Sequence, residues 1–185
     1  MIAAAVALVG FSYHPDHDQC TPHRTRRPAL GGPSVGECVR RHHRGAQGVL
    51  IDASILPGFG TSDGGWLVGL LTYAAASGEC EVVALISTEE GRGIGRGLMD
   101  AARDYAEAAG HRRLWLITTN DNTRAIRFYQ RWGMDLWAFY RHGVRRSRKV
   151  KPSIPERGVD GIPLEHELEF EMLLGGTVRP EVSLR

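Results

Sequence analysis

The sequence predicts a single α/β domain, and two observations support this fold class. The chain has 185 residues, of which 42% are hydrophobic and 24% are charged, with a net charge of +2. A globular chain of this length can bury a core without a metal or a disulfide. Beyond residue 63 the hydrophobic pattern alternates between strand and helix periods, in the order strand, strand, helix, strand, helix, strand, strand.

The first two of these strands form a predicted pair. Residues 64–75 (GGWLVGLLTYAA) and 80–87 (CEVVALIS) are short runs rich in aliphatic and aromatic side chains. The turn-like sequence ASGE separates them, and runs bounded in this way are typical of strands. We therefore expect two neighbouring strands here.

The first helix follows a turn that has glycine at every second position from Gly91 to Gly97. Helical spacing then places one apolar face on the segment, made of Leu98, Ala101, Ala102, Tyr105 and Ala109. Gly110 stands where a helix commonly ends. The pattern predicts an amphipathic helix that begins at the glycine turn.

The second half of the domain continues the alternation. Residues 112–119 (RRLWLITT) predict a third strand, and residues 122–132 predict a second helix, capped by Asn122 and ended by Gly133. Residues 134–140 (MDLWAFY) predict another strand.

The last segments of the domain are a basic run and a strand. Arg141 to Lys151 holds six Lys or Arg residues and no acid, and it predicts a short solvated helix followed by a proline-bracketed loop. Residues 164–173 (LEHELEFEML) alternate strictly between apolar residues or His and Glu. This period predicts a half-exposed strand with its glutamates in solvent.

The N-terminal quarter of the chain differs in composition. Residues 1–12 (MIAAAVALVGFS) predict a strand or short helix rather than a signal peptide, because no basic segment precedes them. The residues that follow, up to residue 48, are rich in His, Arg, Pro and Gly without any period, and predict irregular structure. We expect an irregular segment at 1–48, the domain at 49–174 and a tail at 175–185.

The cysteine count and the hydropathy indicate where the protein works. Three cysteines at irregular spacing do not resemble a secreted disulfide framework, so a cytoplasmic protein is expected. No apolar run approaches the roughly 20 residues of a membrane span, so no membrane partner is expected.

The glycine turn is typical of a phosphate-binding site, because free N–H groups and the positive end of the helix dipole meet there. A P-loop needs a Gly-Lys pair, which the turn lacks. The dinucleotide pattern GxGxxG fails as well, since its last position is Leu98 or Arg96, depending on the starting glycine. The turn alone therefore leaves its ligand undecided.

A second motif decides between ligands. Asn122, Ala125, Phe128, Tyr129 and Gly133 follow the pattern N-x-x-A-x-x-[FY]-Y-x-x-x-G. Together with the preceding turn, helix and strand, this sequence resembles the GNAT N-acetyltransferase superfamily over about residues 66–134. The resemblance implies a mixed, mostly antiparallel central sheet, splayed in its middle, with helices on both faces. It also implies acetyl-CoA as co-substrate and an amine acceptor as partner, with acetyl transfer to a primary amine by direct attack in a ternary complex.

The resemblance also implies the residues that hold the cofactor. The backbone of one strand would meet the pantetheine arm at Val83, Ala84 and Leu85, and Asn122 would hold the same arm. The turn would bind the pyrophosphate through the amides of Gly91, Arg92, Gly93, Ile94, Gly95 and Arg96. Glu90 occupies a position where the family has Arg or Gln, so we expect Glu90 to point away while Arg92 and Arg96 supply positive charge. The turn that aligns best with the family is Glu90 to Gly95, and we prefer this register to a second one, Arg92 to Gly97, which would shift the helix by two residues.

Acetyl transfer to an amine also needs an acid and a base. Tyr129 matches the family's usual acid. The amine, with a pKa near 10.4, must lose a proton before it attacks, and Glu81 and Glu79 are the candidate bases. Strand alternation places both on the same side, so the sequence leaves them undistinguished.

Other interpretations compete with this one. A non-catalytic acyl-CoA sensor or interaction module would keep the same motifs. The basic run could contact nucleic acid, but no base-reading motif accompanies it, so nucleic acid is not expected. A zinc site is not expected either, although its candidate ligands would be Cys20, His23, Cys38, His42 and His43. A homodimer stays open, since a second protomer could complete the acceptor groove.

Overall fold

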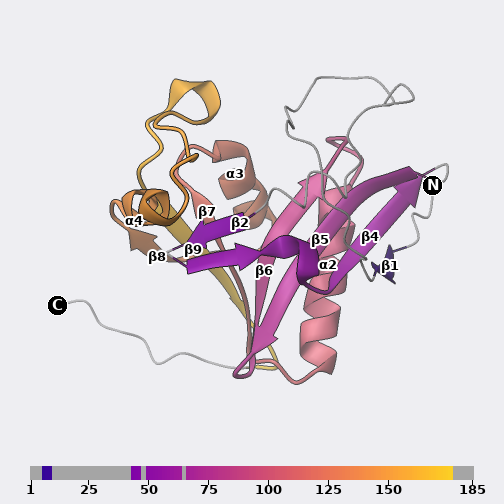
Figure 1. Cartoon of the computed structure of the whole chain (residues 1–185). Coiled ribbons are helices and arrows are strands. Elements are labelled where there is room, and N and C mark those ends of the chain that lie inside the picture. Colours follow the sequence, from indigo (N-terminus) through magenta and orange to yellow (C-terminus); the bar gives the residue numbers. More distant parts are fainter. Residues whose placement is uncertain (1–5, 10–42, 47–48, 64–65, 177–185) are drawn as a thin grey trace.

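The structure is a computed structural model that describes residues 6–9, 43–46, 49–63 and 66–176 (Figure 1). Its strands are β1 (Val6–Val9), β2 (His43–Ala46), β3 (Val49–Asp52), β4 (Gly58–Asp63), β5 (Trp66–Ala76), β6 (Glu79–Ser87), β7 (Arg113–Thr119), β8 (Asp135–Tyr140) and β9 (Glu167–Leu173). Its helices are α2 (Ile94–Ala108), α3 (Thr123–Trp132) and α4 (Gly143–Val150), with 3-10 turns η1 (Ala53–Ile55) and η2 (Val159–Gly161). The predicted order of elements from β5 onward is confirmed.

Seven strands form one mixed sheet in the order β1-β4-β5-β6-β7-β9-β8. Neighbouring strands are antiparallel except β6 and β7, which run parallel in the middle. That parallel pairing ends at Glu81, opposite Trp115, although β6 continues to Ser87 and β7 to Thr119. The two strands therefore part beyond Glu81, and the expected sheet, mostly antiparallel and splayed in its middle, is confirmed.

A tight hairpin and a bulge shape β6. The hairpin between β5 and β6 turns at Ser77 and Gly78, whose φ angles are 55° and 78°. Two consecutive left-handed residues match the twist of the strands, as in type I′ hairpins. Farther along, Val82 and Ala84 each pair with a residue of β5, whereas Val83 is an extra residue between them. This β-bulge lies immediately past the point where β6 leaves β7.

The main core lies between the sheet and the helices α2 and α3. The buried side chains of α2 are Ile94, Leu98, Met99, Ala102 and Ala106. Of the predicted apolar face, Leu98 and Ala102 are fully buried, but Ala109 is exposed and Tyr105 only half-buried. The buried stripe instead begins at Ile94, the first residue of the helix, and advances one turn at a time from there.

The opposite face of the sheet has a smaller apolar cluster and its own cover. Ala53 of η1 packs with Leu70, Val83 and Ala84 of β5 and β6. Figure 1 shows the β2–β3 hairpin crossing in front of β6, with α2 behind the sheet. Helix α4 contacts β2 and β3. Helices therefore cover both faces, as the sequence predicts.

Strand β9 corrects one prediction. Its glutamates Glu167, Glu169 and Glu171 are 2%, 4% and 4% exposed, so the expected half-exposed strand is wrong. The physical reason is that β9 lies inside the sheet, between β7 and β8, and its carboxylates find polar partners there. The Ser147 hydroxyl donates to Glu167 at 2.7 Å, and the Arg113 guanidinium donates to both Glu169 and Glu171.

The N-terminal segment is described only in part. Val6–Val9 form an edge strand paired with β4, so the strand alternative for residues 1–12 is confirmed for these four residues. Residues 10–42 lie outside the described part of the chain. The irregular structure expected up to residue 48 is wrong for His43–Ala46, which pair with β3 as strand β2. The domain boundaries at 48 and 174 stay predictions. In the parts that the structure describes, no helix has both the length and the apolar character needed to cross a membrane.

Candidate active site

The splay leaves one side of the β6 backbone without a strand partner. Val83, Ala84 and Leu85 follow directly after Glu81, the last residue of β6 paired with β7. Ala84 and Leu85 pair with β5 alone, and Val83, at the bulge, pairs with neither strand. Backbone N–H and C=O groups on the β7 side of this segment can therefore meet an extended ligand. These are the residues that the sequence proposed for the pantetheine arm.

The glycine turn connects the end of β6 to the start of α2. Gly91 and Gly93 have φ angles of 76° and 77°, a conformation that glycine adopts without strain. Gly93 is the N-cap of α2, so the next three amides lie in the first helical turn, where no intrahelical acceptor exists. Both left-handed glycines belong to the turn Glu90 to Gly95, the register preferred from the sequence.

The space in front of these glycines is open. A Cβ atom added to Gly91 or Gly93 would meet no other atom of the described residues within 4 Å. Packing within this part of the chain therefore does not require glycine at either position. The backbone conformation and the close approach of a ligand to the amides do, as at an anion-binding helix N-terminus.

We expect Gly93→Ala to weaken acetyl-CoA binding about tenfold, because the added methyl group enters the space in front of the amides. Gly110→Ala is the matched control, since Gly110 has a φ angle of 74°, an equally open surround and a place at the far end of α2. Both variants should lose about 1 kcal/mol of stability from the left-handed backbone. Calorimetric titration checks this; equal affinities of the two variants would contradict it.

The charges around the turn differ from those expected. The Glu90 carboxylate forms an ion pair with Arg124 of α3, so it does point toward another element. The Arg92 guanidinium donates to Glu89 at 2.6 Å and to Asp63 at 2.9 Å. Its positive charge is therefore already paired with two carboxylates. Arg96 is 71% exposed, and its Nε lies 3.8 Å from Asp100.

Arg124 is a residue near the turn that the sequence did not predict. It stands in the first turn of α3, between the motif residues Asn122 and Ala125, and its guanidinium reaches the glycine turn through Glu90. The sequence signal for Arg124 was Glu90, because an acidic side chain where the family has Arg or Gln indicates a positively charged partner nearby. The structure thus brings a third arginine to the turn beside Arg92 and Arg96.

Asn122 is confirmed as the cap of α3. Its side-chain oxygen accepts a hydrogen bond from the Ala125 amide at 3.3 Å, and Gly133 ends the helix with a φ angle of 111°. The cap uses the oxygen and leaves the amide NH₂ group of Asn122 for another acceptor. A cofactor contact at this residue is therefore compatible with its structural role.

Tyr129 lies on the buried side of α3, 8% exposed. Its ring packs against Phe128 of the same helix and Phe170 of β9, with centroids 5.4 and 5.9 Å away. It therefore belongs to the core on the α2 side of the sheet. Val82 of β6 and Leu116 of β7 belong to the same core cluster.

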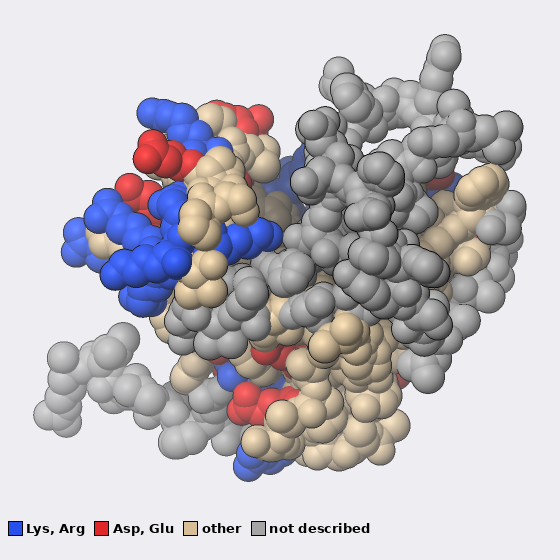
Figure 2. All heavy atoms as spheres, viewed as in Figure 1, with Lys and Arg blue, Asp and Glu red and all other residues tan. Residues whose placement is uncertain are grey.

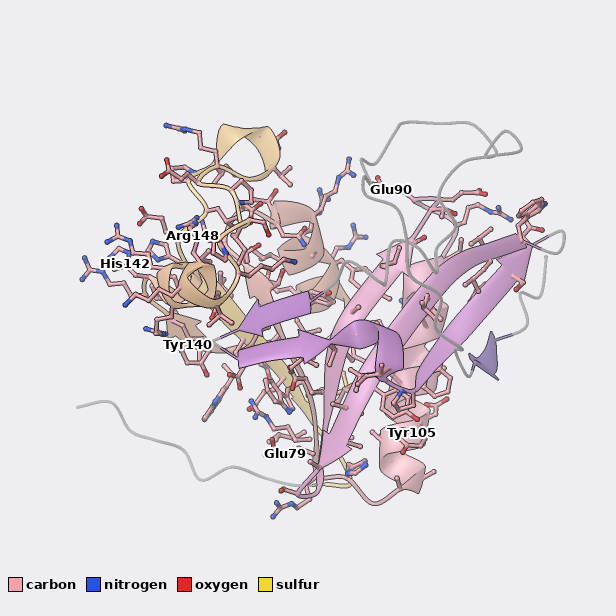
Figure 3. The ribbon with its side chains drawn as sticks, viewed as in Figure 1. Glu79, Glu90, Tyr105, Tyr140, His142 and Arg148 are labelled. Atoms are coloured by element: carbon pink, nitrogen blue, oxygen red, sulfur yellow. The ribbon has the colours of Figure 1, made fainter. Side chains whose placement is uncertain are left out.

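The two candidate bases lie on the other face of β6, since the intervening Cys80 and Val82 belong to the main core. Glu81 is the last residue paired with β7, so it stands where the splay begins. Glu79 is at the hairpin end of β6 and lies 3.4 Å from the Arg113 guanidinium. Figure 3 shows Glu79 and Glu90 near opposite ends of this strand. The pairing of β6 with β7 thus distinguishes Glu81 from Glu79, which strand alternation alone could not do.

A buried polar cluster occupies the same face as Glu81. Arg113 lies on this face with its guanidinium 5.2 Å from the Trp115 ring, and it pairs with Glu169 and Glu171. The hydroxyl of Tyr140 also donates to Glu169. The sequence does not predict this cluster, because strand alternation places these glutamates in solvent.

The basic run forms α4, and Figure 2 shows Lys and Arg side chains gathered on the surface there. Part of the run is structural. Arg148 donates to three backbone carbonyl oxygens in the segment between α4 and β9, those of Ile154, Pro155 and Leu164. Arg145 pairs with Glu165 at 3.3 Å. The expected helix is confirmed, with Val144 and Ser147 buried rather than solvated.

The cysteines give no sign of a nucleophile in the described part of the chain. Cys80 is fully buried, and burial raises the pKa of its thiol to about 11. Such a thiol is almost wholly protonated at neutral pH and is a poor nucleophile. The Cys and His side chains weighed as zinc ligands, from Cys20 to His43, lie outside the described residues.

A sheet splayed between parallel central strands, with a glycine turn that opens the helix after the splayed strand, defines the N-acetyltransferase class of α/β proteins. The chain belongs to the GNAT acetyltransferase family, whose model matches residues 38–134. It is 37% identical over 120 residues to the uncharacterized protein YdhI of Bacillus subtilis (strain 168), covering 64% of this chain and 75% of that protein. It is 36% identical over 132 residues to YxbD of the same organism, covering 68% and 83%.

Solved structures share the fold at low sequence identity. A GNAT family acetyltransferase from Elizabethkingia anophelis with acetyl-CoA bound matches with a TM-score of 0.59 and 16% identity, over 91% of this chain and 98% of that chain. An acetyltransferase from Bacillus subtilis in complex with CoA matches with a TM-score of 0.56 and 17% identity, over 64% and 77%. The fold-family expectation from the sequence is confirmed.

Proposed function

We propose that the protein transfers the acetyl group of acetyl-CoA to the nitrogen of a primary amine by direct attack in a ternary complex. The observation that carries this proposal is the junction of two features on β6: the strand leaves β7 after Glu81, and it ends in a turn with left-handed glycines and open space before them. Related structures with CoA or acetyl-CoA bound support the choice of co-substrate.

The residues present suit this co-substrate. The amides after Gly93 and the positive end of α2 would bind the pyrophosphate, and the free backbone edge from Val83 to Leu85 would bind the pantetheine arm. Of the arginines near the turn, Arg92 and Arg124 are already paired with carboxylates, so Arg96 would add most of the positive charge. When bound, acetyl-CoA supplies an activated acyl group and a thiol leaving group.

Glu81 acts as the base in this proposal. A primary amine of pKa near 10.4 is almost wholly protonated at neutral pH, so it must lose a proton before it attacks. Glu81 stands where the splay begins, on the face away from α2 and α3, and it would accept that proton directly or through water. Glu79 is held by Arg113 at the closed end of the strand pair and is the weaker candidate.

Tyr129 acts on the leaving group, from the opposite face of the sheet. A phenol of pKa near 10 would protonate a thiolate of pKa near 8.5 at a cost of about 2 kcal/mol, so a strong hydrogen bond serves as well as full transfer. The acid and the base thus approach the splay from its two faces. This arrangement lets the amine and the thioester meet between them without a covalent enzyme intermediate, and the buried, protonated thiol of Cys80 agrees with such a route.

A two-stage assay tests the proposal. Acetyl-CoA should raise the melting temperature, because a ligand that binds only the native state stabilises it. Free thiol should then appear with at least one member of a panel of small amines, peptide N-termini and lysine peptides. Tyr129→Phe should lower this rate about a hundredfold, with acetyl-CoA affinity unchanged.

The outcomes separate the competing functions. If acetyl-CoA does not raise the melting temperature, both the acetyltransferase proposal and the acyl-CoA sensor alternative are wrong. A shift without thiol release from any amine, and with no effect of Tyr129→Phe, would favour a non-catalytic acyl-CoA sensor instead.

A further inference from the structure

Three side chains with metal-ligand chemistry meet at the junction of β8, α4 and β9, apart from the splay. They are His142, Glu165 and His166, and one donor atom of each lies within 4.8 Å of the other two. Figure 3 shows His142 beside α4, with Tyr140 close by, whereas Glu79 and Glu90 belong to β6 and its turn. We propose that these three residues form a zinc-binding site that leaves a fourth position for water.

The spacing of two donors already suits a metal. The Nδ1 atom of His142 lies 3.2 Å from Oε2 of Glu165. Two ligands that are each about 2.0–2.2 Å from a tetrahedral zinc ion lie about 3.3–3.5 Å apart. This Nδ1 atom is also buried, and it makes no hydrogen bond within the described part of the chain, despite the short distance to the carboxylate. The distance therefore fits shared coordination of one ion.

The surroundings orient the ligands. Arg145 contacts Oε1 of Glu165 at 3.3 Å, so the other oxygen of the carboxylate faces His142. The Asn120 side chain accepts hydrogen bonds from the backbone amides of Glu165 and His166, at 3.0 and 2.8 Å. Partners of this kind hold ligands in place at metal sites.

The donor set selects the type of metal. Two imidazole nitrogens and one carboxylate oxygen suit zinc and its neighbours in the first transition row. Magnesium and calcium prefer all-oxygen sites and would bind weakly here. The sequence gives no sign of the site, because His142 and His166 are 24 residues apart and meet only when β8 and β9 pair.

Metal binding has one structural consequence that an experiment can follow. In the structure the backbone N–H of His142 donates to Nδ1 of His166 at 3.0 Å. A neutral imidazole has one nitrogen with a free lone pair, so a metal on either ring nitrogen removes this acceptor. Zinc binding should therefore release the His142 amide.

The test is a calorimetric titration of the full chain with zinc chloride, beside proton–nitrogen NMR of the amides. We expect a dissociation constant below about 10 µM and a large shift of the His142 amide resonance. His142→Asn tolerates the left-handed backbone at φ 56°, and in His166→Asn the side-chain oxygen can still accept the His142 amide. Each should weaken binding at least tenfold, and magnesium chloride should leave the amide unmoved.

His111→Asn is the matched control, because His111 lies at the far end of the domain, after α2. It should leave the affinity within twofold of the wild type. Cysteine and histidine side chains before residue 48 could also bind zinc, so the result is read from the variants and the amide rather than from total metal. Binding that is unchanged in His142→Asn and His166→Asn, or a His142 amide that zinc does not move, would overturn the proposal.

Discussion

Replacing Glu81 with glutamine is expected to lower kcat/KM for amine acetylation about a hundredfold, because glutamine cannot accept the proton of the attacking amine. Glu79→Gln is the matched control and should stay within about threefold of the wild type. The two residues share a strand and a face, but Glu81 stands where β6 leaves β7 while Glu79 is held by Arg113. Initial-rate kinetics with saturating acetyl-CoA check both variants.

The pH dependence sharpens this expectation. As pH rises toward the amine pKa near 10.4, more of the acceptor is already neutral and a base matters less. The ratio of wild-type to Glu81→Gln rates should therefore fall as pH rises from 7 to 9. A greater loss of kcat/KM in Glu79→Gln than in Glu81→Gln would contradict the proposal, because it would show that Glu79 is the base.

Replacing Arg113 with methionine is expected to lower the free energy of unfolding by about 3–5 kcal/mol, the usual cost of removing one partner of a buried ion pair. Arg113 is 9% exposed and pairs with Glu169 and Glu171, themselves 4% exposed each. Without the guanidinium, Glu169 keeps the Tyr140 hydroxyl but no cation among the described residues. Urea denaturation of the two proteins measures the difference.

Arg103→Met is the matched control, because Arg103 also pairs with two carboxylates, Asp100 and Asp104, but at the surface. Exposed pairs contribute little, so this variant should lose less than about 1 kcal/mol. Equal deficits in the two variants would contradict the buried-pair account.

The sequence predicted the elements whose signals are local. The Ser77–Gly78 hairpin, the Asn122 cap and the Gly133 helix end all depend on residues within a few positions of one another, and the structure has each of them. The splay followed from the family motif rather than from any periodicity. The sequence left two glycine registers for the turn and favoured Glu90 to Gly95, and the φ angles at Gly91 and Gly93 agree with that choice.

Features that depend on the neighbours of a strand could not be read from the sequence. Alternating Leu and Glu on β9 is typical of a strand with one wet face, but β8 and β7 enclose it and Arg113 meets its carboxylates from 56 and 58 residues away. The same limit applies at the candidate site. Alternation treats Glu79 and Glu81 alike, and only the pairing with β7 separates them.

The central claim is that the acetyl group passes directly from acetyl-CoA to an amine nitrogen. The most direct test is a single turnover with isotopically labelled acetyl-CoA and an amine from the thiol-release screen, followed by mass spectrometry of the amine and of the intact protein. The account predicts one labelled acetyl group on the amine for each thiol released, and none on the protein at any time. A labelled protein that forms before the amine product and then decays would contradict it.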